Sequence, residues 1–218
     1  MNAKHACKLL ALSLAFAGNL AQAHGGHDHN GHAEQPPAAR QEKASVRFAD
    51  VSLLNQDGMP VRLEKDLVGD HLVVMGFIYT SCTTVCPVVS SIMGKVQQQL
   101  GGRVGQDIHL VSISVDPQRD DAKRLQDYAK AFQKGPGWSW LTGTPYAISE
   151  TLKGLGSFSA DLRQHPPLIL VGDGRTGHWT RYYGFTDPAV LIDEINRLGA
   201  RRVHAKSTAI ADHHEVQP

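Results

Sequence analysis

The sequence predicts an α/β protein with a central mixed β-sheet, flanking helices and an N-terminal β-hairpin. Runs rich in β-branched residues recur along the chain, and several are followed by apolar residues at helical spacing. Turn residues, mostly Gly, Pro and Asp, separate these segments. Strands that alternate with helices favour a sheet whose faces are covered by helices.

The first predicted elements are a hairpin, a buried strand and a helix. In "VSLLNQDGMPVRL" apolar runs flank Asp57-Gly58, which predicts the hairpin. Residues 72–79 form an uninterrupted β-rich run that is typical of a buried central strand. After this strand a helix is predicted, because apolar residues recur at helical spacing at Val85, Val89, Ile92, Val96 and Leu100. Gly101-Gly102 ends this helix.

The later elements continue this alternation. "IHLVSISV" predicts a strand, and Leu125 and Ala129 lie on one side of the next helix. "WSWLTG" precedes a short helix over residues 146–155, and its two tryptophans suggest one buried and one exposed side chain. "LILV" and "WTRYYGF" predict strands paired across a glycine-rich turn, before a final helix lined by Leu191, Ile195 and Leu198.

Residues 1–23 have the features of a cleavable signal peptide. Lys4 and Lys8 precede the apolar residues 9–17, and Ala21-Gln22-Ala23 matches a cleavage site. No segment reaches the ~20 apolar residues that span a bilayer. We therefore expect a periplasmic or otherwise exported protein that is soluble after cleavage, without a transmembrane anchor, and that loses Cys7 with the signal.

The remaining chain divides into three predicted parts. Residues 24–44 are polar and glycine-rich, which predicts a disordered tail. Residues 45–199 form the folded domain, and residues 200–218 form a flexible C-terminal tail. The first tail holds His24, His27, His29 and His32, which we interpret either as a solvated segment or as a collector of Cu(II) or zinc.

Charge and cysteine content narrow the function classes. Removal of residues 1–23 takes away two lysines and no acid, so the formal charge changes from 22 − 21 = +1 to 20 − 21 = −1. This balance gives no sign of the basic face that nucleic-acid binding needs. A domain of this length does not need a disulfide staple, so the remaining close pair of cysteines is more typical of chemistry than of structure.

The cysteine pair lies in "YTSCTTVCP", between the predicted central strand and its helix. A helix that starts around Cys82 would place Cys82 and Cys86 on one face, one turn apart. Backbone N–H groups at a helix start stabilise thiolates, which are both nucleophiles and metal ligands. The spacing is one residue wider than C-x-x-C, so a redox pair and a site for Cu(I) or zinc both remain open.

Several other residues are weaker candidates. His165 precedes the "LILV" strand, and the restricted X-Pro backbone holds it in an extended position from which it could supply a third ligand. Asp116 in "SVDPQRD" is more typical of a turn cap than of a site. We interpret His71 and His109 as structural and His178 as an exposed hairpin residue.

Four segments resemble one known family. "FIYTSCTTVCP" resembles the F-x-Y-T-x-C-x-x-x-C-P motif of the Sco/SenC copper chaperones, which have a thioredoxin-like fold. "SISVDPQRDDAKRLQDYAKAF", "WSWLTGT" and "HPPLILVGD" are similar to that family's V-D-P-x-R-D, W-x-x-L-T-G and H-x-P-x-I-x-L-x-D segments. The likeness covers residues 46–199. Gln164 and Pro166 depart from it, since Asp and Ser or Thr are usual there, and this affects the support of His165.

The resemblance implies a copper site in which Cys82 and Cys86 are thiolate ligands and His165 is the imidazole ligand for Cu(I) or Cu(II). It also implies a role in assembling the dinuclear copper centre of cytochrome c oxidase. The expected partners are the copper-receiving oxidase subunit or another exported copper protein, and other copper carriers.

Three function classes therefore remain. The sequence favours a copper metallochaperone, which is a carrier rather than an enzyme. The alternatives are a thiol–disulfide oxidoreductase, with Cys82 and Cys86 as its redox pair, and a redox or copper sensor. A role for His165 separates the first two, because disulfide exchange needs only the thiols.

Overall fold

The structure is a computed structural model that describes residues 40–214. The predicted signal peptide and the four tail histidines lie outside the described residues, as do residues 215–218. Along the described chain, no helix has both the length and the apolar character needed to cross a membrane.

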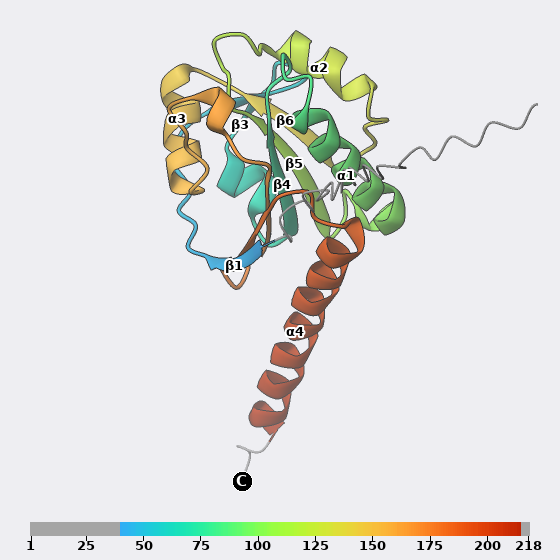
Figure 1. Ribbon diagram of the computed structural model, residues 1–218. Helices are drawn as coiled ribbons and strands as arrows, with labels where there is room; N and C mark the ends of the chain where they lie inside the picture. Colours follow the sequence, from blue (N-terminus) through green and yellow to red (C-terminus); the bar gives the residue numbers. More distant parts are fainter. Residues whose placement is uncertain (1–39, 215–218) are drawn as a thin grey trace, which may run out of the picture. The chain divides into compact units, whose positions relative to one another are not determined.

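The described residues form an eight-stranded mixed sheet in the order β1-β8-β7-β4-β5-β6-β2-β3 (Figure 1). Strands β4, β5 and β6 run parallel, and every other neighbouring pair in this sheet is antiparallel. The strands are β1 Arg40–Ala44, β2 Leu53–Asn55, β3 Pro60–Val61, β4 Leu72–Ile78, β5 Ile108–Ser114, β6 Trp138–Thr142, β7 Leu168–Asp173 and β8 His178–Tyr183.

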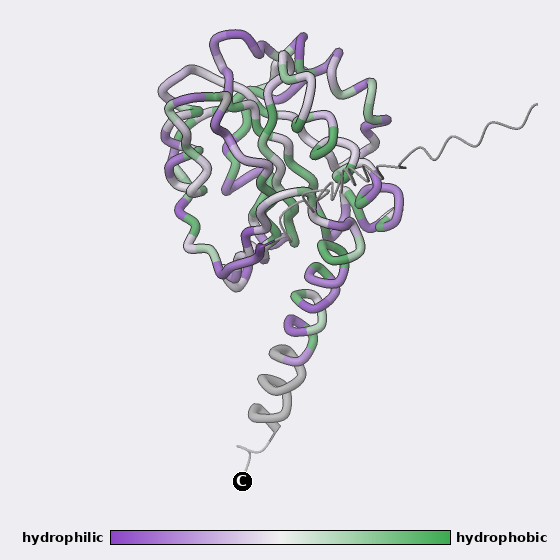
Figure 2. Tube along the Cα trace, viewed as in Figure 1, coloured by the Kyte–Doolittle hydropathy of each residue, from purple (hydrophilic) through white to green (hydrophobic). Residues whose placement is uncertain are grey.

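Helices cover both faces of this sheet. The helices are α1 Val85–Leu100, α2 Ala122–Lys130, α3 Pro145–Gly154 and α4 Pro188–His214, with short turns η1 Leu63–Val68, η2 Gly101–Arg103 and η3 Leu162–Gln164. Residues of α1, α2 and α4 pack into one apolar core, and residues of α3 and η1 pack into a second. Figure 2 shows hydrophobic residues concentrated in the central strands between these layers. The predicted α/β sandwich is confirmed.

Strand β4 lies between the two apolar cores and packs against both. All seven of its residues are buried, and they alternate between the cores: Val74 and Ile78 face α1, whereas Val73, Met75 and Phe77 face α3. At Gly76 an added Cβ would lie 3.4 Å from Val89 of α1, so α1 packs closely on this strand. The end of β4, and with it the cysteine loop, is therefore rigidly supported.

The predicted hairpins are confirmed. Strand β2 pairs antiparallel with β3 around Gly58, whose positive φ of 76° suits a tight turn. Strands β7 and β8 pair with Leu168 opposite Tyr183 and Asp173 opposite His178.

Both predicted tail boundaries are wrong. Residues 40–44, assigned to the disordered tail, form the edge strand β1 along β8, where Glu42 accepts hydrogen bonds from Arg181 at 3.1 Å and Tyr183 at 2.9 Å. Residues 200–214, assigned to the flexible C-terminal tail, continue helix α4. The Arg202 guanidinium binds the buried Asp173 carboxylate at 2.9 and 2.5 Å. The composition of these two segments did not predict ordered structure, because the residues that bind them lie far away in the sequence.

The expectation for the tryptophans is also wrong. Trp138 and Trp140 are both buried, and their rings stack with centroids 4.9 Å apart. Side chains two residues apart on a strand lie on the same face, so burial of one brings the other with it.

Candidate metal centre

The two cysteines lie on either side of the start of helix α1. Helix α1 begins at Val85, so Cys82 belongs to the preceding loop and Cys86 to the first helical turn. The predicted start near Cys82 is therefore three residues early. Pro87 explains the difference, because proline lacks an N–H and is tolerated only in the first turn, where N–H groups have no partner within the helix.

The loop and the helix start bring the sulfur of Cys82 to the backbone of Cys86. The Cys86 N–H donates a hydrogen bond to Cys82 Sγ at 3.3 Å, and Thr84 Oγ1 lies 3.9 Å from the same sulfur. Both cysteines are free thiols and are buried, with 7% and 3% of their surface exposed. The turn thus brings the Cys82 sulfur to the backbone of Cys86, without a helical face that carries both cysteines.

The two thiols have opposite electrostatic surroundings. Burial raises the pKa of Cys82, but hydrogen bonds from the backbone of Cys86 and Thr84 outweigh it and lower that pKa to about 7. For Cys86, burial together with the neighbouring Cys82 thiol raises the pKa to about 12. Burial and a hydrogen bond to Cys82 likewise raise the pKa of Tyr79 to about 12. Cys82 is thus the more readily ionised of the two thiols.

His165 lies at the same end of the sheet as the cysteine loop. Strand β7 runs antiparallel to β4 with Ile169 opposite Gly76, so the residues before β7 extend past the end of β4. The imidazole, however, points to the α3 side: its Nε2 lies 3.0 Å from Ser157 Oγ, and its ring centroid lies 6.1 Å from that of Phe77. Burial lowers the pKa of His165, which favours the neutral, metal-binding form.

The structure does not bring the three predicted ligands into one cluster. Within residues 40–214, no group of three His, Cys, Asp or Glu side chains is arranged to hold a metal ion. Cys82 and Cys86 form a dithiol whose soft donors fit Cu(I), and the imidazole of His165 contacts Ser157 instead of joining them.

The remaining candidates have structural surroundings. His71 and His109 stack with ring centroids 4.0 Å apart, and His109 Nδ1 lies 2.8 Å from the carbonyl oxygen of Leu67. Asp116 forms an ion pair with Arg119 at 3.0 Å and its carbonyl accepts the N–H groups of Arg119 and Asp120, as a turn residue does. His178 is an exposed residue of the β7–β8 hairpin.

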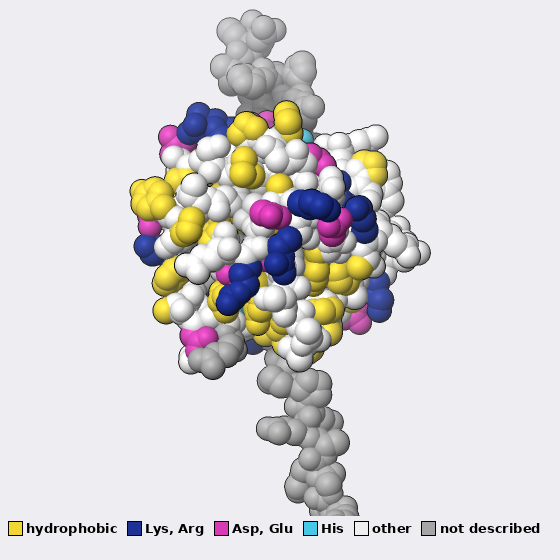
Figure 3. Space-filling view, turned by 90° about the horizontal axis from the view of Figure 1, so that it is seen from above, with side chains coloured by type: hydrophobic (Ala, Val, Ile, Leu, Met, Phe, Trp, Pro, Cys, Tyr) yellow, Lys and Arg dark blue, Asp and Glu magenta, His cyan; other side chains and the backbone are white. Residues whose placement is uncertain are grey.

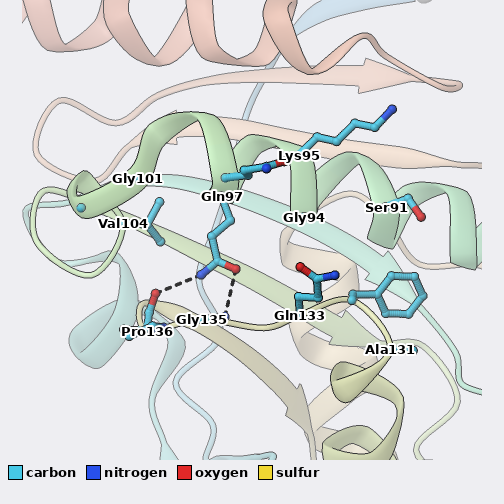
Figure 4. Close-up of a pocket in the computed structure, with 13 residues that line it drawn as sticks. Ser91, Gly94, Lys95, Gln97, Gly101, Val104, Ala131, Gln133, Gly135 and Pro136 are labelled. Atoms are coloured by element: carbon cyan, nitrogen blue, oxygen red, sulfur yellow. Dashed lines mark hydrogen bonds between the residues drawn. The ribbon is translucent and has the colours of Figure 1, made fainter.

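A pocket elsewhere on the surface contains none of the predicted site residues. It has a volume of about 560 Å³ and lies between α1 and the segment that leads from α2 to β6. Gln97 crosses it, donating to the carbonyl of Pro136 at 3.1 Å and accepting from the N–H of Gly135 at 3.0 Å (Figure 4). The two cysteines are buried and do not line this pocket.

Sequence reasoning missed three residues that contact the predicted ligands or the cysteine loop. Tyr79 contacts Cys82 and stands in the quoted motif itself, so its neighbourhood could have been inferred from position. In "VDPQRD" the sequence indicated Asp116 as the candidate. The structure shows that Asp120, the second aspartate of this segment, accepts hydrogen bonds from Thr80 of the cysteine loop. No local signal marks Ser157, because its contact with His165 depends on the fold.

A thioredoxin-like sheet with two free cysteines at the β4–α1 junction is the arrangement that the resemblance predicted. The model of the SCO1/SenC family matches residues 39–198, and the chain belongs to this family. It is 33% identical over 144 residues to the SCO1 protein homolog of Bacillus subtilis. The matched region covers 65% of this chain and 69% of that protein.

Solved structures agree on the fold. The structure resembles Arabidopsis thaliana ScoI with copper bound, with a TM-score of 0.61 at 23% identity, covering 72% of this chain and 99% of the other. It also resembles BsSco, described as a member of the Sco family of cytochrome c oxidase assembly proteins with a disulfide switch. That likeness has a TM-score of 0.61 at 22% identity and covers 73% of this chain and 96% of the other.

Proposed function

We propose that this protein is an exported copper metallochaperone that helps to assemble the dinuclear copper centre of cytochrome c oxidase. The observation that carries the proposal is the buried, reduced pair of Cys82 and Cys86 at the β4–α1 junction, in a chain of the SCO1/SenC family. A structural neighbour with copper bound supports copper as the metal.

The dithiol suits copper capture in two steps. Cys82, with its pKa of about 7, offers a thiolate near neutral pH, whereas Cys86 is still protonated. A copper ion held first by Cys82 would lower the pKa of the neighbouring thiol, so that Cys86 releases its proton as it binds. Uptake of copper is thus coupled to proton release and becomes weaker as the pH falls.

His165 would be the third ligand. Its neutral imidazole must exchange the hydrogen bond with Ser157 for the metal, which requires the segment before β7 to turn its ring towards the cysteine side of the sheet. A three-coordinate site of two thiolates and one imidazole suits both copper oxidation states better than the thiolates alone.

A partner that accepts the copper must approach this end of the sheet. Val88 in the first turns of α1 is 40% exposed, and Phe185, just after β8, is 48% exposed. Figure 3 views the face on which α2 lies, where hydrophobic patches alternate with Lys, Arg, Asp and Glu side chains. Such a mixed surface suits a transient contact with the copper-receiving oxidase subunit or with another copper carrier.

The asymmetry of the thiols favours a second function, reduction of the disulfide in a target protein. The Cys82 thiolate would attack the target disulfide and form a mixed disulfide, and Cys86 would then displace the second target sulfur as a thiol. Two electrons pass from the dithiol to the target, and this protein is left with a Cys82–Cys86 disulfide.

The test compares copper affinity with disulfide reduction in the same variants. We expect the reduced protein, lacking residues 24–39, to bind one copper, measured by competition with a chromophoric Cu(I) chelator and by the thiolate-to-Cu(II) absorption band. His165→Ala should weaken Cu(II) binding more than tenfold, whereas His178→Ala, the exposed matched control, should change it less than twofold.

The outcomes separate the candidate functions. Reduction of a disulfide substrate by His165→Ala at the wild-type rate, together with the loss of affinity, would support copper binding through His165 and an independent thiol reaction. Equal copper uptake by the oxidised protein would contradict the dithiol site. Unchanged affinity of His165→Ala for both oxidation states would favour the oxidoreductase.

A further inference from the structure

A buried carboxylate holds the start of the cysteine loop. Asp120 is 1% exposed and follows the turn after β5. It accepts hydrogen bonds from the N–H of Thr80 at 2.9 Å, the hydroxyl of Thr80 at 2.5 Å and the hydroxyl of Ser114 at 2.7 Å. All three partners donate, which is the arrangement that an ionised carboxylate requires.

The charge of this carboxylate is not neutralised by a neighbouring cation. Among the described residues Asp120 takes part in no ion pair with Lys or Arg, and the adjacent Arg119 pairs with Asp116 instead. Three hydrogen bonds satisfy the oxygen atoms but leave one negative charge in the interior. Burial of an unpaired charge is costly, so such a group is a candidate for a functional role.

The same charge acts on the two thiols. Thr80, which Asp120 binds through two bonds, precedes Cys82 by two residues. Among the effects on Cys86, burial comes first, but the charge of Asp120 also raises the pKa of that thiol. Burial raises the pKa of Tyr128 to about 12, and the charges of both cysteines and of Asp120 act in the same direction. The Tyr128 hydroxyl lies 3.5 Å from Ser90, one turn after Cys86. Asp120 therefore lies within electrostatic range of the site.

We propose that Asp120 is a positioning residue whose negative charge favours Cu(II) over Cu(I) at the dithiol. The inference rests on the proposed copper function. With two thiolates and a neutral imidazole, the Cu(I) form carries a charge of −1 and the Cu(II) form is neutral. A fixed negative charge destabilises the first more than the second, so reduction of Cu(II) by one electron from an external reductant such as ascorbate becomes less favourable.

The effect extends to the metal-free protein. Oxidation by glutathione disulfide converts the dithiol to the Cys82–Cys86 disulfide and yields two glutathione molecules. The disulfide is neutral, whereas disulfide exchange runs through a negatively charged thiolate, so the charge of Asp120, which binds Thr80 two residues before Cys82, also favours the disulfide.

The test removes the charge while keeping the bonds. In Asp120→Asn the amide oxygen can accept from the Thr80 N–H and Ser114, and the amide nitrogen can donate to the Thr80 hydroxyl. We expect the ratio of Cu(II) to Cu(I) affinity to fall about tenfold, which is the effect of one pKa unit of interaction. The glutathione equilibrium at pH 7.5 should move towards the dithiol.

Two matched variants separate charge from geometry. Asp116→Asn makes the same chemical change at the neighbouring acid that Arg119 already neutralises, and it should change the affinity ratio less than about twofold. Thr80→Val removes the hydroxyl bond to Asp120 but keeps the charge, and the ratio should likewise be retained. If Asp120→Asn does not fold, Asp120→Ser, which is also neutral, provides the comparison.

The outcomes distinguish this inference from the proposed function. If the wild-type protein binds no copper, the copper function fails, while the glutathione equilibrium of Asp120→Asn still tests the charge. If the wild type binds copper and Asp120→Asn changes neither the ratio nor the glutathione equilibrium, the inference is wrong. An equal shift in Thr80→Val would assign the effect to loop geometry and would also overturn it.

Discussion

The imidazole Nε2 of His165 lies 3.0 Å from Ser157 Oγ, on the α3 side of the sheet, whereas Cys82 and Cys86 lie on the α1 side. The third predicted ligand is thus held by a hydrogen bond that copper replaces in the proposed site. The free energy of that hydrogen bond is then subtracted from the free energy of copper binding, so a stronger bond lowers the copper affinity.

Ser157→Ala should therefore bind copper more tightly than the wild type. The hydrogen bond contributes about 1 kcal/mol to the metal-free protein, so its loss should raise Cu(II) affinity about fivefold and speed binding. Stopped-flow absorbance of the thiolate-to-Cu(II) band measures both quantities. Ser159→Ala is the matched control, since its hydroxyl bonds the carbonyl of Asp161 instead. Weaker binding by Ser157→Ala would mean that Ser157 supports His165 in the copper-bound state.

The two cysteines should differ in reactivity with pH. With a pKa of about 7, Cys82 is half ionised near neutral pH, so its alkylation by iodoacetamide should fall as the pH decreases through about 7. The pKa of Cys86 is about 12, so that thiol should react slowly at every pH up to 9. Peptide mass spectrometry of the reduced, metal-free protein quantifies both sites. Equal rates for the two thiols would contradict the assigned nucleophile.

The N-terminal segment should contain two functionally separate parts. Deletion of residues 24–39 should lower the number of bound Cu(II) ions, because it removes four histidines, and should leave the melting temperature unchanged. Deletion of residues 24–44 also removes β1 and leaves Arg181 without Glu42, which should cost about 2 kcal/mol of unfolding free energy. Copper titration and chemical denaturation of the two truncated proteins test this. Equal stability of both would mean that β1 adds nothing to the domain.

The part of helix α4 around Arg202 should be held to the sheet by the buried ion pair with Asp173. Arg202→Met leaves the Asp173 carboxylate buried without its cation, which should cost about 3 kcal/mol at pH 7. Arg201→Met, at the exposed neighbouring position, should cost less than about 0.5 kcal/mol. Urea denaturation of both variants gives the comparison.

The pH dependence of this anchor follows from Asp173. Burial raises the pKa of this carboxyl, but the bonds from Arg202 and Thr176 outweigh it, and the net pKa lies below the ordinary 3.8. The stabilisation is therefore present above pH 3.8 and is lost as the pH falls through the lowered value. The difference between Arg202→Met and the wild type should shrink under acidic conditions, and a constant difference would contradict the ion pair.

Local patterns were sufficient for most of the architecture. The alternation of β-rich runs with helical apolar spacing predicted the layers, and Asp57-Gly58 predicted the first hairpin, because periodicity and turn chemistry are properties of neighbouring residues. Strand β1 and the end of α4 were not predicted, because they depend on contacts with distant residues. Their residues are polar, and they are ordered by Arg181 and Asp173, which lie far from them in the chain.

The chemical groups of the candidate site can be read from the amino-acid order alone: two cysteines four apart, at a strand end and before a proline that limits where the helix can start. The differences between these groups arise from contacts between distant parts of the chain. The pKa values of Cys82 and Cys86 depend on backbone N–H groups, burial and the charge of Asp120, and the position of His165 depends on Ser157. Electrostatic and hydrogen-bond energies depend on distance in space, which the chain sets only when distant segments pack together.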